Sequence, residues 1–328
     1  MTRTALVTGV GGQDGVLAAR RLLADGLRVV GTTRPDRGAG PMAPYLDGVE
    51  QVSVDLRDIA SLTDLIEELR PDEIYHLAAV TTVGAGWARP DEVEAVNVDA
   101  VDALVAAVCG VIPEARVFLA SSSEVFGPDA ANPQDETTPL SPQNPYARSK
   151  ASLHRIAETA RAAGTFVSVG ILYNHESPIR PVHFVTRKVA RAAAEIASGR
   201  RESLSLGNLH TSRDWSAAED VVDAMVRMAR AESPRDYVVA SGRLHTIREL
   251  VEAAFGAAGV GDPWSHVAQD PDLMRSGDAT GWQGDASLLR AELGWTPTTP
   301  FEDLIGSMVH ADLRRLESGV EEDPAYLE

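Results

Sequence analysis

Short apolar runs alternate with longer amphipathic stretches along most of the chain. The runs are rich in Val, Ile and Leu and have the length of buried strands, and the stretches between them repeat apolar residues at helical spacing, as over 93–108. Strand and helix patterns that alternate in this way predict an α/β fold with a parallel, doubly wound sheet, whose ligands lie at the carboxyl ends of the strands. The expected strands cover 4–8, 27–33, a run ending near 54, 74–79, 116–120, 166–172 and 236–240.

The order of these elements predicts two interleaved regions. We expect a Rossmann-like domain over 1–172, to which a segment near 209–240 returns, and a smaller substrate-binding region that occupies mainly 173–328. A helix over 301–316 closes the second region, and the acidic tail at 317–328 is expected to fray into solvent.

A glycine-rich turn follows the first predicted strand and opens the first predicted helix. Gly9, Gly12 and Gly15 are spaced so that the backbone turns sharply, its N–H groups approach a pyrophosphate, and the helix sits against the strand. The strand before the turn and the helix after it are the context that this fingerprint requires. The turn, with Gln13 and Asp14 inside it, therefore predicts a bound dinucleotide.

The end of the second predicted strand selects between NAD and NADP. Sites of this type that bind NAD place Asp or Glu about 20 residues after the glycines, whereas this chain has Thr33 and Arg34. A guanidinium suits the 2′-phosphate of NADP, so NADP is favoured over NAD. The alternative is that Arg34 is an ordinary exposed loop residue.

Residues that follow the third and fourth predicted strands are further candidate cofactor contacts. Asp55, with Leu56 beside it, is placed to bind the adenine, and a role as the cap of the next helix is an equally good interpretation. Small side chains at the end of the fourth strand let a backbone pass beneath the cofactor, and the residues concerned are Leu77, Ala78 and Ala79.

Tyr146 and Lys150 stand four residues apart at the start of a predicted helix, and a cluster of hydroxyl residues at 121–123 precedes them, after the fifth strand. On a helix this spacing places both side chains on one face, where the ammonium lowers the phenol pKa from its unperturbed value of about 10. A tyrosinate that forms near neutral pH is a general base, so the pair predicts a catalytic site.

Composition narrows the classes of function. The chain has 328 residues and a formal charge of −18, which argues against a nucleic-acid or anionic-membrane surface because phosphates would be repelled. A single cysteine, Cys109, excludes an internal disulfide, and no apolar run approaches the roughly 20 residues of a membrane helix, so a soluble cytoplasmic protein is expected. His175 and Glu176 lack further ligands at suitable helical spacing, so no metal is expected.

Taken together, the motifs resemble extended short-chain dehydrogenases/reductases that act on nucleotide sugars, and more narrowly the GDP-mannose 4,6-dehydratase family. The resemblance covers nearly the whole chain, and its more specific strings are Gln-Asp-Gly and Asn-His-Glu-Ser-Pro. The matching segments are 10–15, 173–178, 184–188, 206–208 and 213–215.

The resemblance implies a redox-neutral reaction on an NDP-hexose, most simply GDP-mannose. Tyr146, assisted by Lys150 and Ser122, would take the proton of the 4-hydroxyl while hydride leaves C4. Glu124 would then remove the C5 proton, water would leave from C6, and hydride would return to C6 to give a 4-keto-6-deoxy sugar. The substrate-binding residues that the resemblance implies are Thr81, Ser123, Asn174, Val185, Lys188, Arg213 and Arg275.

Departures from the family pattern leave alternatives open. Segment 35–41 stands where the family has a second arginine and a longer loop used in tetramer contacts, which makes a tetramer doubtful. The resemblance implies a homodimer packed through the helices near 94–108 and at Tyr146, which a charge at Val101 or Leu153 would disrupt. Residues 80–83 differ from the family and line the expected sugar pocket. The alternatives are an epimerase or decarboxylase acting on a UDP-sugar and, less in keeping with Tyr146, a non-catalytic NADP sensor.

Overall fold

The computed structural model describes residues 2–81, 83–273 and 281–328. Their contacts divide the chain into two compact units, and the chain passes between them more than once. The first unit comprises 1–172, 222–239 and 285–295, and the second comprises 173–221, 240–284 and 296–328. Residues 209–221, which were expected in the segment returning to the first domain, therefore belong to the second unit, because they contain a strand that pairs there.

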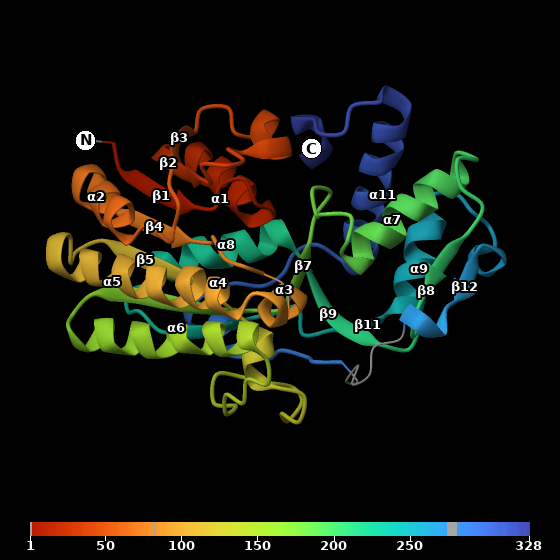
Figure 1. Ribbon diagram of the computed structural model, residues 1–328. Helices are drawn as coiled ribbons and strands as arrows, with labels where there is room; N and C mark the ends of the chain where they lie inside the picture. The colour runs from red at the N-terminus through yellow and green to blue at the C-terminus, as the bar shows by residue number, and fades with distance from the viewer. Residues whose placement is uncertain (1, 82, 274–280) are drawn as a thin grey trace. The chain divides into compact units, whose positions relative to one another are not determined.

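The first unit is built on a seven-stranded parallel sheet in the order β10-β6-β5-β4-β1-β2-β3 (Figure 1). The order reverses between β1 and β4, so the carboxyl ends of these two strands border the crevice where doubly wound sheets bind their ligands. The α/β Rossmann-like fold expected from the sequence is thereby confirmed. The strands are β1 (Thr4–Thr8), β2 (Arg28–Thr33), β3 (Glu50–Ser53), β4 (Glu73–His76), β5 (Arg116–Ser122), β6 (Phe166–Leu172) and β10 (Asp236–Val239).

Helices cover both faces of this sheet. One face packs against α2, α5 and α6 in a continuous apolar core, in which Leu56, an expected cofactor contact, is also buried. The other face carries α1 and α8, which an ion pair between Arg21 and Asp223 joins. The helices of this unit are α1 (Gln13–Ala24), α2 (Ile59–Leu69), α3 (Val83–Ala88), α4 (Pro90–Glu94), α5 (Ala100–Val111), α6 (Pro145–Ala162), α8 (Ala218–Ala229) and α10 (Ser287–Leu293), with short 3₁₀ helices η1 (Gly40–Tyr45) and η3 (Ser123–Phe126).

The single helix expected over 93–108 is three consecutive segments. Between α4 and α5 the backbone forms a π-helical turn, η2 (Ala95–Asp99), which contains the buried side chain of Asn97. A π-turn inside a helix often marks a functional position, because the wider turn redirects one side chain.

The second unit contains two small sheets and three long helices around its own core. The core joins apolar faces of α7, α9 and α11 to β8 and β9. Its sheets have the orders β11-β9-β7 and β12-β8. The elements are β7 (Asn174–Glu176), α7 (Val185–Ala197), β8 (Leu204–Leu206), β9 (Ser212–Ala217), β11 (Leu244–Thr246), α9 (Ile247–Ala257), η4 (Pro263–Ser265), β12 (Val267–Gln269), η5 (Pro271–Leu273), α11 (Phe301–Ser318) and η6 (Pro324–Leu327).

The acidic tail after α11 is folded back, so the expectation that it frays was wrong. Its last residues form η6, and Tyr326 is buried with its hydroxyl donating to the carbonyl of Val320 at 2.6 Å. Arg315, a buried residue of α11, lies over the Tyr326 ring and donates to the carbonyl of Glu321 at 2.7 Å. Arginines on the preceding helix therefore hold a segment that composition alone assigned to solvent.

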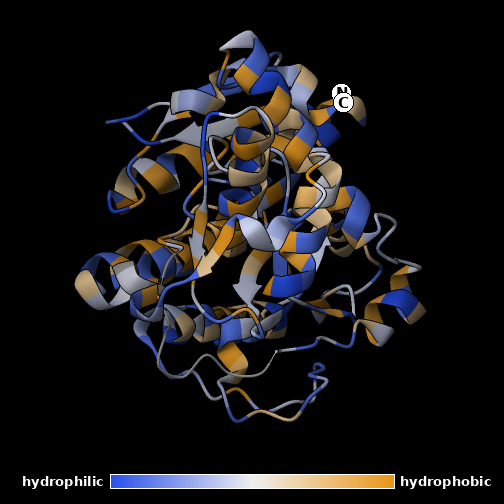
Figure 2. Ribbon diagram, turned by 90° about the vertical axis from the view of Figure 1, so that its right-hand side faces the viewer, coloured by the Kyte–Doolittle hydropathy of each residue, from blue (hydrophilic) through white to orange (hydrophobic). Residues whose placement is uncertain are grey.

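The distribution of apolar residues around the helices agrees with these two cores. Figure 2 shows helical ribbons that change from hydrophobic to hydrophilic around their circumference, as amphipathic helices do. Within the described ranges, no helix combines the length and apolar character needed to cross a bilayer.

Candidate active site

The glycine turn between β1 and α1 is shaped for close backbone contact. Gly9 has a φ of +73°, and a Cβ at this position would lie 2.8 Å from the Cα of Ala78. A Cβ on Gly15 would overlap the carbonyl oxygen of Gly9, so glycine is what lets α1 pack against the turn. Gly12 is the N-cap of α1 and has no side chain to fill that position, which leaves the helix N-terminus open to an anion. The turn therefore fits the pyrophosphate of a dinucleotide.

Thr8, the last residue of β1, fixes the segment that follows β4. Its Oγ1 accepts hydrogen bonds from the N–H groups of Leu77 at 3.1 Å and Ala78 at 3.2 Å. The same oxygen lies 3.1 Å from Nδ1 of His76, a buried side chain whose pKa burial lowers to about 3. The strand consequently ends at His76, earlier than expected, and Leu77, Ala78 and Ala79 form a partly buried loop.

The charged residues that follow β2 and β3 are exposed Arg34 and partly buried Asp55. Arg34 donates two hydrogen bonds to Asp36, at 3.0 and 2.7 Å. Asp55 accepts from the guanidinium and the N–H of Arg57, and these hydrogen bonds lower the pKa of Asp55 to about 2. Asp58, not Asp55, caps α2 by accepting from the N–H of Ser61, so the capping interpretation of Asp55 was wrong.

Tyr146 and Lys150 lie in the first two turns of α6, against the end of β5. Lys150 is 6% exposed, and its Nζ donates to the carbonyl of Ala120 at 2.7 Å and lies 5.9 Å from the centre of the Tyr146 ring. Burial lowers the pKa of Lys150 to about 8, and the carboxylate of Asp14 acts in the opposite direction. The electrostatic effect of Asp14 on Lys150 shows that the glycine turn and this pair lie close together, at the carboxyl ends of the strands.

Ser122 and Glu124 lie on the other segment of this site, at the junction of β5 and η3. The hydroxyl of Ser122 accepts from the N–H of Glu124 at 3.3 Å. Asn144 donates from its amide to the Glu124 carboxylate at 3.2 Å, while its own carbonyl oxygen accepts from the N–H of Ala147 at 2.8 Å and caps α6. One side chain therefore joins the carboxylate to the helix that carries Tyr146.

The sequence analysis missed Asn144, although its signal is local. Asn followed directly by Pro145 is a typical helix start, with a capping side chain and a proline whose fixed φ suits the first turn.

Asn97, in the π-turn, is a second residue that the sequence analysis missed. Its side chain accepts from the N–H of Val80 at 2.8 Å and donates to the carbonyl of Val80 and to Oγ of Ser149, both at 3.1 Å. The loop after β4 is thereby attached to α6. Thr81 follows Val80 and is exposed, whereas Ser123, another expected substrate contact, is buried.

The second unit places its expected substrate residues on β7, α7 and β9. Asn174 begins β7 and pairs with Trp215 of β9, so that it lies beside the strand that carries Arg213. Arg213 lies with its guanidinium carbon 5.8 Å from the centre of the Trp282 ring. The pairing of β7 with β9 therefore makes Asn174 and Arg213 neighbours within this unit.

Val185 and Lys188 occupy the first turn of α7. Val185 packs against the core of the second unit, and Nζ of Lys188 donates to the carbonyl of Ser205 at 2.8 Å. Burial lowers the pKa of Lys188, and Arg201 adds to the effect. Arg275, the last of the expected substrate contacts, lies outside the described residues.

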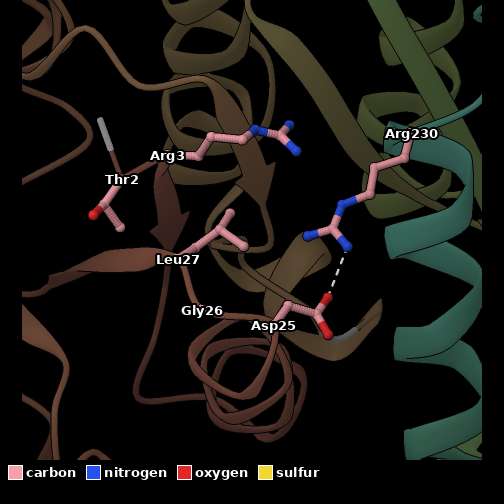
Figure 3. Close-up of a pocket in the computed structure, with 6 residues that line it drawn as sticks. All are labelled: Thr2, Arg3, Asp25, Gly26, Leu27 and Arg230. Atoms are coloured by element: carbon pink, nitrogen blue, oxygen red, sulfur yellow. Dashed lines mark hydrogen bonds and ion pairs between the residues drawn. The ribbon is translucent and has the colours of Figure 1, made fainter.

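A polar hollow of about 490 Å³ lies at the opposite edge of the first unit's sheet, where β1 and β2 begin (Figure 3). Arg3 and Arg230 face it and both pair with the buried carboxylate of Glu73, while Arg230 also reaches Asp25 at 2.7 Å. Because the amino ends of the strands lie here, this hollow is separate from the site at their carboxyl ends.

Comparisons with known proteins show which chains this one is similar to. The family model described as GDP-mannose 4,6 dehydratase matches residues 6–308. GDP-mannose 4,6 dehydratase 2 from Arabidopsis thaliana is 39% identical over 95% of this chain and 87% of its own length, and the human GDP-mannose 4,6 dehydratase is 35% identical over 96% and 92%. Among solved structures, RMD from Pseudomonas aeruginosa complexed with NADPH is 27% identical with a TM-score of 0.80, over 96% of this chain and 100% of that one.

Proposed function

This chain belongs to the GDP-mannose 4,6-dehydratase family, and from that premise we propose that it converts GDP-mannose to the GDP-linked 4-keto-6-deoxy sugar with NADP as cofactor. The observation that carries the proposal is the joint placement of Glu124, Tyr146 and Lys150 where β5 ends and α6 begins, beside a turn shaped for a pyrophosphate. A carboxylate, a phenol and an ammonium are the groups that oxidation, deprotonation and dehydration require.

NADP, when bound, would supply the hydride acceptor for C4 of the hexose and the hydride donor for C6. Tyr146, as the phenolate, takes the proton of the 4-hydroxyl, and the nearby ammonium of Lys150 stabilises that phenolate. The hydroxyl of Ser122 donates to the sugar oxygen and orients it. Gly9, Gly12, Gln13, Asp14 and Gly15 hold the cofactor's pyrophosphate.

Glu124 removes the proton from C5, which the new ketone at C4 has made acidic. The C5–H electron pair forms the C5=C6 double bond as the C6–O bond breaks. The departing hydroxyl leaves as water with the proton that Tyr146 took from the 4-hydroxyl, which restores the phenolate. Asn144 donates to the Glu124 carboxylate at 3.2 Å and so holds it in one orientation. Hydride addition at C6 is followed by return of a proton from Glu124 to C5, and the carboxylate is regenerated.

The nucleotide is the part of the substrate that the second unit holds. Asn174, Lys188 and Arg213 supply an amide and two cations for the diphosphate and base, because arginine and lysine match phosphate oxygens. Val185 adds apolar contact at the start of α7, and Arg275 completes the proposed set.

Incubation with GDP-mannose and NADP in deuterated water, followed by mass spectrometry, tests the function. We expect loss of one water and incorporation of one solvent deuterium at C5, because Glu124 exchanges its proton with solvent between removal and return. UDP-glucose in place of GDP-mannose is the control and should remain unchanged. Conversion of the UDP-sugar with GDP-mannose left intact would contradict the proposal and support an epimerase or a decarboxylase.

Arg34 is proposed as the residue that selects NADP. Its guanidinium is exposed and already pairs with Asp36, so it is a cation at the end of β2 that a phosphate can recruit. Replacing Arg34 with alanine is expected to weaken NADP binding by roughly 10- to 100-fold, the value of a charge-assisted hydrogen bond, with little change for NAD. The Asp36→Asn variant should instead bind NADP more tightly, because the guanidinium loses its competing carboxylate. Both affinities are measured by cofactor fluorescence titration.

Arg28→Ala is the matched control for this test. Arg28 lies at the opposite end of the same strand and pairs with exposed Glu50 at 2.6 Å, much as Arg34 pairs with Asp36 at 2.7 Å. Equal NADP affinities of the Arg34→Ala variant and the wild type would remove Arg34 from the site.

A homodimer formed through α5 and α6 remains our proposal for the assembly. Val101 and Leu153, the positions first considered for disrupting it, are each 1% exposed and belong to the core of the first unit, so a charge there would unfold the protein rather than separate two copies. Ala106 is exposed on α5 and is the position at which a charge tests the dimer.

We also infer a cytoplasmic location. Cys109, the single cysteine, forms no internal disulfide, so the fold has no need of an oxidising compartment.

A further inference from the structure

A chain of polar contacts continues from Lys150 into the interior of the first unit. His154 lies one turn beyond Lys150 on α6, so that Tyr146, Lys150 and His154 share one face of the helix. Nδ1 of His154 contacts Oδ2 of Asp236 at 2.5 Å, and Nε2 lies 2.9 Å from Oγ of Ser121. The same Ser121 oxygen lies 3.3 Å from the main-chain carbonyl oxygen of Lys150. Three elements, β5, α6 and β10, are joined through this one imidazole.

Asp236 and Arg161 form the inner end of this series of polar contacts. Arg161 donates to the second carboxylate oxygen of Asp236 at 2.5 Å and to the carbonyl of Val167 at 2.6 Å. Burial acts to raise the pKa of Asp236, but the hydrogen bonds from His154 and Arg161 outweigh it and hold that pKa below its usual value. The carboxylate is therefore charged and sets the ring orientation by accepting from Nδ1 of His154. Because Ser121 donates its single proton to the carbonyl of Lys150, Nε2 of His154 donates to the Ser121 oxygen.

The order Ser121, His154 and Asp236 is that of a hydrolase triad, but its surroundings exclude that role. Ser121 is 4% exposed, and its hydroxyl is directed between His154 and the backbone of α6. A serine nucleophile has to reach a substrate carbonyl and a set of oxyanion donors, and a buried hydroxyl facing a helix reaches neither. Ser121, His154 and Asp236 therefore hold β5, α6 and β10 together.

Lys150 is attached to β5 at two points. Its Nζ donates to the carbonyl of Ala120, and its main-chain carbonyl accepts from Ser121, the next residue along the strand. Ser122 follows directly. These two contacts attach α6 to Ala120 and Ser121, the two residues that precede the hydroxyl of Ser122. The contact with Ala120 uses the ammonium of Lys150, and the contact with Ser121 does not. Without the Ser121 contact, the core still holds α6, but only the ammonium contact fixes Lys150 against β5, so the Tyr146–Lys150 pair can shift slightly relative to Ser122.

We propose that His154, oriented by Asp236 and acting through Ser121, is a positioning residue that holds the Tyr146–Lys150 pair in register with Ser122. The inference rests on the proposed function for the roles of Tyr146, Lys150 and Ser122. His154 itself touches neither substrate nor cofactor. Its effect is to keep the Lys150 ammonium at the distance from the phenol where it favours the phenolate.

His154→Phe and Ser121→Ala test this proposal. Phenylalanine keeps an aromatic ring in the packed position but removes both nitrogens, and Ser121→Ala removes one hydroxyl with little change of volume. Ser152→Ala is the matched control, because Ser152 lies on the same helix and its hydroxyl donates to the carbonyl of Arg148, at 3.2 Å, one turn back. If His154→Phe does not fold, Ser121→Ala alone carries the test.

The first measurement needs no substrate. Each variant is titrated with base, and the absorbance of tyrosinate near 295 nm is followed. The same titration is repeated with Tyr146→Phe added to each variant, and the difference between the two curves reports the ionisation of Tyr146. Ionisation of Tyr146 is expected to move about one pH unit higher in both variants, which corresponds to about a tenfold loss of phenolate at a given pH. Ser152→Ala should titrate like the wild type. Because the protein alone is titrated, this result stands whether or not GDP-mannose is the substrate.

The second measurement separates positioning from general damage to the fold. We expect kcat to fall by about tenfold in both variants, in line with the lost phenolate, whereas KM for the nucleotide sugar and Kd for NADP stay within about twofold of the wild type. An unchanged Tyr146 titration in a folded variant overturns the proposal. A rise in KM and Kd that parallels the loss of kcat also overturns it, since that is the result of a structural role only.

Discussion

The Tyr146→Phe variant is expected to lose roughly 10²- to 10⁴-fold in the rate of GDP-mannose conversion, the usual contribution of a positioned acid–base group, while it keeps its affinity for NADP. Phenylalanine preserves the ring beside Lys150 but leaves no oxygen to take the proton of the 4-hydroxyl. Conversion is followed by mass spectrometry of the nucleotide sugar, and NADP affinity by fluorescence titration.

The pH dependence of the wild-type rate gives this prediction a second form. Burial lowers the pKa of Lys150 to about 8, so the ammonium that stabilises the phenolate is lost as the pH rises through that value. The rate is therefore expected to fall on the alkaline side of about pH 8.

Tyr237→Phe is the control for removing a tyrosine hydroxyl. Tyr237 is buried in β10, and its hydroxyl donates to Glu292 at 2.8 Å, so this change costs about 1 kcal/mol of stability and leaves turnover intact. Full turnover by Tyr146→Phe would refute the mechanism, and a wild-type protein that binds NADP without converting any nucleotide sugar would be a sensor instead.

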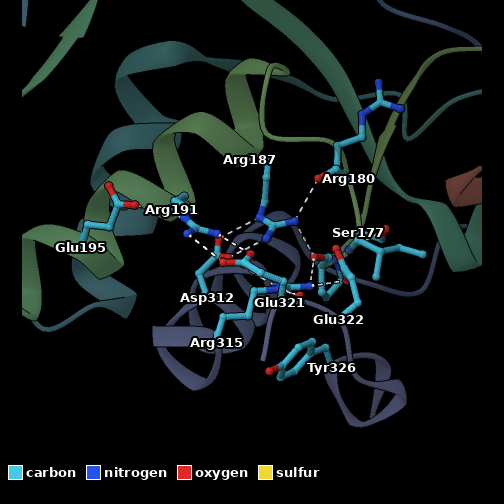
Figure 4. A network of polar contacts seen from close by, with 12 residues as sticks. Ser177, Arg180, Arg187, Arg191, Glu195, Asp312, Arg315, Glu321, Glu322 and Tyr326 are labelled. Atoms are coloured by element: carbon cyan, nitrogen blue, oxygen red, sulfur yellow. Dashed lines mark hydrogen bonds and ion pairs between the residues drawn. The ribbon is translucent and has the colours of Figure 1, made fainter. Parts of the chain in front are cut away.

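Asp312→Ala is expected to destabilise the second unit by about 3 to 5 kcal/mol. Asp312 is fully buried in α11 and pairs with Arg187 at 2.6 and 2.8 Å and with Arg315 at 3.3 Å, and both arginines are also buried (Figure 4). Removing the carboxylate leaves two guanidinium groups in a low-dielectric interior without the anion between them. The loss is measured as the change in free energy of unfolding by urea denaturation.

The same substitution is expected to raise KM for the nucleotide sugar. Arg187 donates to the carbonyls of Pro178 at 2.8 Å and Arg180 at 2.9 Å, and Arg315 donates to the same carbonyl of Pro178 at 3.0 Å. The Asp312 carboxylate thus orients the arginines that hold the loop directly after the Asn-His-Glu-Ser-Pro string.

Glu252→Ala is the control for loss of a carboxylate from a helix. Glu252 pairs with Arg248 at 3.3 Å on α9, and both side chains are half exposed, so this change is expected to cost less than about 1 kcal/mol. If Asp312→Ala costs no more than Glu252→Ala, the buried network does not stabilise the second unit.

Local motifs predicted much of the proposed site. Gly15 lies against Gly9 within one turn, and Tyr146 and Lys150 lie four residues apart on one helix, so short-range spacing was enough to propose them together. Asn144 belongs to the same class, because a capping asparagine before a proline is a local signal that was available and not used.

Other residues depend on contacts between distant segments. Helical periodicity placed Val101 and Leu153 on the apolar faces of their helices, but it did not tell whether the chain itself or a second copy covers those faces. The structure shows that both residues are covered by the core of the first unit. The tail at 317–328 is acidic, and its composition alone gave no sign of the arginines on α7 and α11 that bind it.

The sequence by itself determined the fold class, the glycine turn, the Tyr146–Lys150 pair and the family, because each is encoded in short-range spacing or in strings of adjacent residues. Only the tertiary structure decided which charges are paired and which polar groups are buried. Asp236 is joined to Lys150 through His154 and Ser121, and Asp312 is joined to the loop at 178–180 through two arginines. These networks bring together residues as far as 82 and 137 positions apart along the chain. The energy of such contacts depends on distance and burial in space, and no periodicity along the chain carries that information.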